Sequence, residues 1–237
     1  MKNSYLYGPV ISRRLGNSLG VNIIPFKTCS FDCIYCEWGK TINPTNERKE
    51  YLPTSEIIAE LNSYLKTGPD LNYISFAGLG EPTLHIGIGQ IINFLKENYP
   101  QYKVAVLTNA SLFHHQQVLQ DIKNSDLVIP SLNGISREAF NKVNLPFISL
   151  KTENIIKGIN NLKKSFTGQI WLEIFIVPGI NDTPRELDLF KEALKRINVD
   201  KVQLNTLDRP GTCSTIKPAG KEHMREIASY LGNVEII

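Results

Sequence analysis

Three cysteines with the spacing C-x3-C-x2-C, Cys29, Cys33 and Cys36, are the residues of this chain best suited to chemistry. A fourth cysteine, Cys213, lies far downstream. Cysteine thiolates are the usual ligands of iron–sulfur clusters, and a cubane [4Fe–4S] cluster normally takes four of them. A cubane held by three thiolates would keep one iron with an open coordination position, where a metal site performs chemistry.

Other uses of these cysteines fit the spacing less well. Three neighbouring cysteines cannot all pair in disulfides. Zinc usually takes four ligands, often in two separated pairs. The residues that could supply a fourth ligand form no second pair: Cys213, His85, His114, His115 and His223. A non-catalytic iron–sulfur or zinc binder, such as an electron carrier or an assembly scaffold, remains the second hypothesis.

The cysteine spacing, with Tyr35 directly before the last cysteine, resembles that of the radical S-adenosylmethionine (radical SAM) superfamily. The resemblance implies that Cys29, Cys33 and Cys36 hold a [4Fe–4S] cluster whose fourth iron is chelated by the amino and carboxylate groups of SAM. It also implies reductive cleavage of SAM to a 5′-deoxyadenosyl radical that abstracts hydrogen from a substrate. An electron donor such as flavodoxin or ferredoxin would then be a partner. The protein's part is to bind and orient the cofactors and the substrate and to exclude water from them.

Extended apolar runs alternate with helical patterns along the chain, which predicts an α/β fold with a parallel sheet. The predicted strands are Val21–Pro25, Tyr73–Ala77, Lys103–Thr108, Asp126–Pro130, Ile170–Val177 and Lys201–Asn205. The predicted helices are Thr54–Lys66, Ile88–Asn98, His115–Lys123, Thr152–Lys164, Pro184–Arg196 and Lys221–Leu231. Val234–Ile237 is either a short edge strand or a disordered tail.

The alternation does not separate an open doubly wound sheet from a barrel. The resemblance implies a partial (β/α)6 TIM-like barrel of parallel strands in a single domain. Within it we predict an N-terminal lead-in arm over residues 1–20 and the barrel over residues 21–210. A C-terminal loop and helix over residues 211–237 would close the barrel.

The active site of such a barrel lies at the carboxyl ends of its strands. After the second predicted strand, Gly78–Pro82 resembles the GGE motif of the superfamily, with Leu79 in place of one glycine. The resemblance implies that Glu81 receives the SAM amino group; the alternative is a simple Gly-Pro turn.

Polar side chains at the other strand ends are further candidates for cofactor contacts, although such residues also form turns and caps for local reasons. Glu173 interrupts an apolar strand, and a buried carboxylate needs a partner; it faces either the barrel or a surface groove. The resemblance assigns ribose contacts to Ser131 and Asn133 and adenine packing to Val177. The full set of cofactor-binding candidates is Tyr35, Gly78, Gly80, Glu81, Asn109, Ser131, Asn133, Glu173, Val177 and Asn205.

Three residues are candidates for a catalytic role. Arg13 and Arg14 lie in a glycine-rich lead-in and could bind a carboxylate or phosphate in bidentate fashion, or form a solvated surface arm. Cys213 lies in a polar loop near the open end of the barrel. It could donate a hydrogen atom or bind a substrate, or be incidental.

Composition restricts the partners only weakly. With 26 Lys and Arg against 23 Asp and Glu, the net charge of +3 is compatible with an anionic partner without indicating one. No apolar run reaches the roughly 18–20 residues of a membrane span. The first residues lack the apolar stretch of a signal peptide. Together with free thiols, these features predict a cytoplasmic protein without a membrane partner.

The resemblance extends over nearly the whole chain. The lead-in Tyr7–Gly20, the segment Gly78–Thr83 and Gln203–Thr206 resemble a compact group of radical SAM proteins described as similar to wyosine-forming tRNA enzymes. This chain has no second cysteine cluster, and its basic residues are scattered. A small molecule, a peptide and RNA therefore remain open as substrates.

Overall fold

The structure, a computed structural model, describes residues 4–147 and 150–237. Its main sheet has eight strands in the order β1-β2-β5-β6-β7-β8-β9-β10. Their bounds are β1 (Leu6–Ser12), β2 (Gly16–Val21), β5 (Tyr73–Phe76), β6 (Lys103–Thr108), β7 (Leu127–Pro130), β8 (Gln169–Ile176), β9 (Lys201–Thr206) and β10 (Glu235–Ile236). Strands β1 and β2 are antiparallel, and every other neighbouring pair is parallel.

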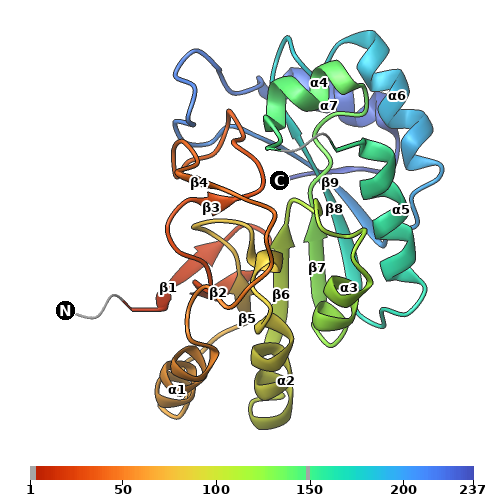
Figure 1. The fold of residues 1–237 in the computed structure, drawn as a ribbon. Coiled ribbons are helices and arrows are strands. Elements are labelled where there is room, and N and C mark those ends of the chain that lie inside the picture. Colours follow the sequence, from red (N-terminus) through yellow and green to blue (C-terminus); the bar gives the residue numbers. More distant parts are fainter. Residues whose placement is uncertain (1–3, 148–149) are drawn as a thin grey trace.

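Helices connect the successive parallel strands. They are α1 (Thr54–Leu65), α2 (Ile88–Asn98), α3 (Gln116–Ile122), α4 (Arg137–Asn144), α5 (Thr152–Lys163), α6 (Pro184–Leu194) and α7 (Lys221–Leu231), with a 3-10 turn η1 (Pro82–Leu84). The strands follow one another in chain order without the reversal of a doubly wound sheet. With edges at β1 and β10, this is a partial (β/α)6 barrel in one domain, as predicted (Figure 1).

The core lies between the helices and one face of the sheet. Apolar stripes on the helices, such as Ile57 and Leu61 of α1, share one buried cluster with Ile74 of β5 and Val104 of β6. The intervening strand residues point to the opposite, inner face, where Ala105 belongs to a separate small cluster. Helices at the predicted positions therefore follow from the 3.6-residue spacing of apolar side chains.

The predicted first strand over Val21–Pro25 is wrong, because the strand is β2, which ends at Val21. Ile23 and Ile24 are buried in the core as expected, but they form no strand. Strand β2 packs closely on β1 at Gly20. A Cβ at this position would lie 1.9 Å from the ring of Tyr7, so glycine is what allows that ring to cover the strand. Within the lead-in that was predicted as an arm over residues 1–20, β1 and β2 form a hairpin that pairs with β5.

The hairpin also fills the amino end of the barrel. Leu15, in the turn between β1 and β2, is 4% exposed and packs with Ala105, Leu127 and Ile129 on the inner face. At the other edge, β10 pairs in parallel with β9, so of the two alternatives for Val234–Ile237 the structure shows the edge strand, over Glu235–Ile236.

Helix α4 and the strands β3 (Thr28–Cys29) and β4 (Asn43–Pro44) were not expected from the sequence. Helix α4 lies between β7 and α5, and the short strands β3 and β4 form a parallel pair. In Figure 1 the β3–β4 segment lies on the opposite side of the sheet from α5 and α6. Among the described residues, no helix combines the length and apolar character needed to cross a bilayer.

Candidate functional site

The cysteine loop leaves the sheet after β2 and is closed by its own hydrogen bonds. Strand β3, which contains Cys29, pairs with β4 at the far end of the loop. Between them, Thr41 N–H donates to Asp32 Oδ1, and Thr41 Oγ1 donates to the Phe31 carbonyl at 2.7 Å. A tight turn brings Cys36 N–H to the Cys33 carbonyl at 3.1 Å. These contacts keep the three thiols on one compact loop.

Each of the three cysteine sulfurs accepts a hydrogen bond from the side-chain N–H of a different residue, and two of these residues lie outside the cysteine loop. Asn109 Nδ2 lies 3.7 Å from Cys29 Sγ. Asn144 Nδ2 lies 3.3 Å from Cys33 Sγ. Lys27 Nζ lies 3.1 Å from Cys36 Sγ. The donors follow β6, end α4 and precede β3, so three separate elements converge on the sulfur atoms.

This donor set fits a cubane cluster. In the described part of the chain, no three His, Cys, Asp or Glu side chains converge on a single point as one zinc ion would require. A cubane needs no such convergence, because each thiolate binds a different iron. N–H donors to ligand sulfurs are also a recurrent feature of iron–sulfur sites.

The three cysteines are partly exposed, and their surroundings change the pKa of two of the thiols. Burial raises the pKa of Cys33 to about 11 and that of Cys29 above its usual range. Since thiolates, rather than thiols, are the metal ligands, binding of a metal group here must release these protons.

Glu81, at the end of β5, is 2% exposed and already surrounded by donors. Its carboxylate accepts from Thr83 N–H at 3.0 Å and from Thr83 Oγ1 and Thr108 Oγ1 at 2.6 Å. Asn109 N–H donates to its other oxygen at 2.8 Å. Burial raises the pKa of Glu81, and the hydrogen bonds from Thr108 and Thr83 oppose that rise. Glu81 therefore ties the end of β5 to the end of β6.

The two glycines before Glu81 have separate structural reasons. Gly78 has φ of +101°, which favours glycine. At Gly80 a Cβ would lie 2.0 Å from the Thr28 carbonyl oxygen, so glycine lets this segment approach the start of the cysteine loop. Tyr7 and Asn22 lie against Gly78, so both glycines let neighbouring parts of the protein pack closely on this segment.

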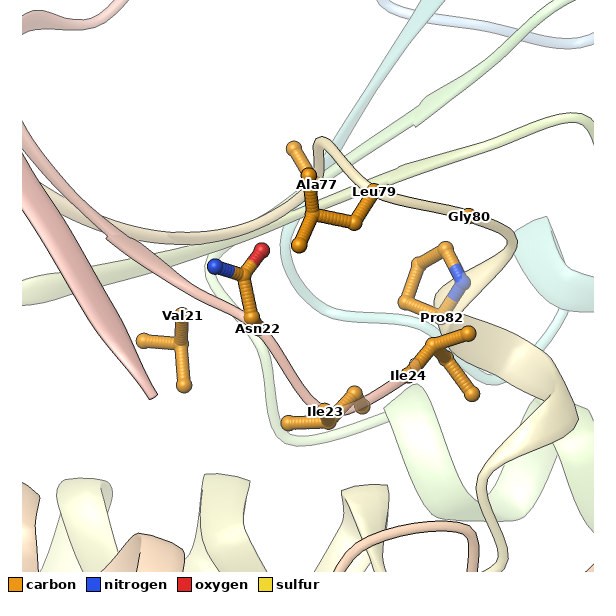
Figure 2. Close-up of a pocket in the computed structure, with 8 residues that line it drawn as sticks. All are labelled: Val21, Asn22, Ile23, Ile24, Ala77, Leu79, Gly80 and Pro82. Atoms are coloured by element: carbon orange, nitrogen blue, oxygen red, sulfur yellow. The ribbon is translucent and has the colours of Figure 1, made fainter. Parts of the chain in front are cut away.

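A small cavity lies between the segments that follow β2 and β5. Figure 2 shows the side chain of Asn22 directed toward Ala77 and Leu79 across this cavity. Asn22 Oδ1 is buried and has no hydrogen-bond partner in the described part of the chain. An unpaired buried acceptor beside Gly78 suits a ligand that brings an N–H or O–H group.

Tyr35 and Asn133 join the cysteine loop to the ends of β7 and β8. The ring of Tyr35 stacks on Phe175 with centroids 4.0 Å apart. Asn133 Nδ2 donates to Tyr35 Oη at 2.7 Å, and Asn133 Oδ1 accepts from Phe175 N–H at 2.8 Å. Val177 is buried in the same cluster. The Asn133 side chain thus holds its neighbours in place.

Glu173 faces the interior of the barrel and has three partners. Arg14 Nη1 lies 2.7 Å from one carboxylate oxygen, and Asn205 Nδ2 lies 3.1 Å from the same oxygen. Ser131 Oγ donates to the other oxygen at 3.0 Å. Arg14 comes from the β1–β2 turn, whereas Arg13 is exposed and pairs with Asp208 at 3.7 Å.

The loop that follows β9 packs on the cysteine loop, and Figure 1 shows it beside the β3–β4 segment. Cys213 N–H donates to the Ile34 carbonyl at 2.9 Å, and Thr212 Oγ1 donates to the Cys36 carbonyl at 3.1 Å. Gly211 lies directly on the Tyr35 backbone. The thiol of Cys213 contacts Thr215 Oγ1 at 3.0 Å.

The structure therefore groups the sequence candidates into two neighbouring sets. The first set consists of the three cysteines and Tyr35 in the cysteine loop, with Asn109 and Asn133 in contact with it. The second set is a polar group inside the barrel, formed by Ser131, Asn205, Glu173 and Arg14. Sequence reasoning missed Asn22, Lys27 and Asn144. Lys27 had a signal in its position just before the first cysteine; Asn144 had none, because α4 was not predicted.

Comparisons with known proteins agree with this geometry. The sequence model of the radical SAM superfamily matches residues 23–191. The chain is 33% identical to a UPF0026 protein of Methanocaldococcus jannaschii over 96% of this chain and 71% of that protein. It is 36% identical to a protein of Brachyspira hyodysenteriae named GTPase Obg, covering 97% of this chain but only 34% of that protein. The chain thus spans about a third of the length of that relative.

Two solved structures share the fold. A radical SAM methyltransferase from Sphaerobacter thermophilus has a TM-score of 0.70 at 14% identity, covering 93% of this chain and 65% of that one. TYW1 with a lysine–pyruvate adduct bound has a TM-score of 0.65 at 16% identity, covering 90% of this chain and 72% of that one. At such identities the likeness concerns the fold.

Proposed function

Since this chain belongs to the radical SAM superfamily and is an enzyme of that class, we propose that Cys29, Cys33 and Cys36 bind its [4Fe–4S] cluster. With SAM also bound, these cofactors would supply the reductive cleavage of SAM to a 5′-deoxyadenosyl radical, which would abstract hydrogen from the substrate. The observation that carries this assignment is the set of three cysteine sulfurs, each with its own N–H donor.

The SAM site we propose lies along the ends of β5 to β8, beside the cysteine loop. The backbone of Gly78–Gly80 and the unpaired Asn22 Oδ1 offer acceptors for the SAM amino group. Glu81 then acts chiefly by fixing this backbone, since four donors already surround its carboxylate. We place the adenine beside Tyr35 and Val177, which belong to one apolar cluster at this edge of the site.

The substrate we propose enters the interior of the barrel, where Ser131, Asn205, Glu173 and Arg14 form the polar group. This group suits a polar small molecule or a peptide side chain. The fold of TYW1 keeps a wyosine-type tRNA substrate as a second candidate. A cytoplasmic location and an electron donor such as flavodoxin or ferredoxin complete the proposal.

The first test is cluster assembly. We expect the Cys33→Ala variant, reconstituted anaerobically with iron and sulfide, to lose most of its iron and the visible absorbance of the cubane, because two thiolates hold a cubane poorly. Cys213→Ala is the matched control, and it should keep native iron content. Equal iron content in the Cys33→Ala variant and the native protein would refute the assignment.

The second part of the test separates an enzyme from an iron–sulfur carrier. The reconstituted native protein is incubated with dithionite and SAM, and chromatography measures 5′-deoxyadenosine. The proposal expects this product. A stable cubane that never yields it, even with broad substrate mixtures, would favour the carrier.

A further inference from the structure

Lys27 is a lysine held in the interior beside the cysteine loop. It is 4% exposed, and its φ of +54° lies in the left-handed region that non-glycine residues rarely adopt. Its N–H donates to the Leu79 carbonyl at 2.6 Å. Its carbonyl accepts from Ile42 N–H at 3.1 Å and Asn43 N–H at 3.0 Å. The backbone is thus fixed on both sides, which directs the side chain toward the thiols.

The ammonium group lacks the partner that a buried lysine usually has. A buried charge is costly unless an opposite charge or several hydrogen bonds compensate it. Within residues 4–147 and 150–237, no ion pair joins Lys27 to a carboxylate, and its side chain donates to Cys36 Sγ at 3.1 Å. The compensating negative charge is therefore expected on the cysteine sulfurs.

The three donors to the cysteine sulfurs differ in charge. Cys36 is in direct contact with Nζ of Lys27. Asn109 and Asn144 also donate to cysteine sulfurs, but their amides carry no net charge. Lys27 thus differs from the other two donors in adding a full positive charge.

We propose that Lys27 raises the reduction potential of the cluster, acting through the Cys36 thiolate by its hydrogen bond and its charge. The proposal rests on the proposed function, because it requires a cubane on these cysteines. One-electron reduction by an external donor adds a negative charge to the cluster. A fixed cation in a site of low dielectric stabilises that added charge. Hydrogen bonds to the sulfurs act in the same direction.

The test measures potentials in the absence of SAM. Native protein and the variants Lys27→Met, Lys27→Gln, Lys27→Arg and Lys40→Met are reconstituted anaerobically, and iron content and absorbance establish the cubane. The reduced cluster is then titrated against potential by electron paramagnetic resonance. We expect Lys27→Met to lower the ratio of reduced to oxidised cluster at least tenfold at a fixed potential, a shift of about 59 mV for a one-electron couple.

The other variants separate charge from hydrogen bonding. Lys27→Gln keeps an N–H donor without the charge and should show a large part of the shift. Lys27→Arg keeps the charge and should stay near the native potential. Lys40, exposed in the same loop, provides the control, and its variant should match native protein.

The other possible outcomes would overturn either the role of Lys27 alone or the proposed function as well. Intact cubanes with native potentials in the Met and Gln variants would overturn the role of Lys27 and leave the proposed function standing. Failure of both variants to hold a cubane would make Lys27 a structural residue and also overturn it. A native protein that forms no cubane would overturn the proposed function, and the role of Lys27 with it.

Discussion

Buried polar side chains at the ends of β5 and β6 show how single residues build this site. Glu81 accepts four hydrogen bonds from Thr83, Thr108 and Asn109. Asn109 in turn reaches Cys29 Sγ and Ser30 Oγ through its side chain. A residue expected to meet a cofactor directly thus also supports the residues that contact the cysteine loop.

The Glu81→Gln variant tests this support. An amide N–H₂ would replace one acceptor oxygen and face donors that then have no partner. We expect the free energy of unfolding to fall by about 1–3 kcal/mol, measured by urea unfolding of the metal-free protein. Glu97→Gln, on the exposed side of α2, should change little. Native stability in the Glu81→Gln variant would mean that the carboxylate serves a ligand alone.

Helix α7 at the end of the barrel is attached to the loop after β8 by a titratable pair. His223 Nε2 lies 2.8 Å from Asp182 Oδ2, and Glu226 lies 3.5 Å from the other ring nitrogen. The hydrogen bond that His223 donates to Asp182 raises the pKa of His223 above its usual value. We therefore expect the strength of this contact of α7 to depend on pH.

A raised histidine pKa contributes stability that is fully present below the unfolded value of about 6.5 and is lost as the pH rises through the folded pKa. We expect His223→Gln to lower the urea midpoint more at pH 6 than at pH 9. An equal loss at both values would show that the protonated ring adds nothing. The effect should be small, since the side chain is 42% exposed.

The sequence predicted the elements whose apolar spacing is regular, and it failed where contacts with distant residues decide. Helix α7 was predicted with its observed bounds, and Gly232 follows it with φ of +99°. Strand β2 contains glycine and asparagine, which strands disfavour, and the ring of Tyr7 in β1 packs directly on its Gly20. Helix α4 had only a Ser136 cap and a short apolar stripe as signals.

The candidate site was also predicted where local sequence patterns define it and missed where distant contacts do. The cysteine spacing and the polar strand ends were visible in the sequence, because chemistry restricts residue types there. The donor Asn144 was not, since it follows Cys33 by 111 residues and meets it only in the fold.

At the scale of the whole molecule, a partly buried ion pair joins the first hairpin to strand β8. Arg14 in the first hairpin meets Glu173 in β8, 159 residues away, and their side chains are 17% and 12% exposed. The pair crosses the inner face of the barrel, so it couples the hairpin to the strands on the far side.

Arg14→Met should leave the Glu173 carboxylate buried without its cation. We expect a loss of about 2 kcal/mol in the free energy of unfolding, less than for a fully buried pair. Adding Glu173→Gln should recover part of that loss in a double-mutant cycle. Arg13→Met, at an exposed arginine, is the control. Additive losses from Arg14→Met and Glu173→Gln would show that the two side chains do not interact.

The three residues that donate hydrogen bonds to the cysteine sulfurs come from different parts of the chain. Lys27, Asn109 and Asn144 belong to segments that no shared helix or strand joins. We therefore expect a metal group on the three cysteines to help hold these segments together, through the hydrogen bonds that the cysteine sulfurs accept. Oxygen damage to that group would cost the protein part of its architecture as well as its reactivity.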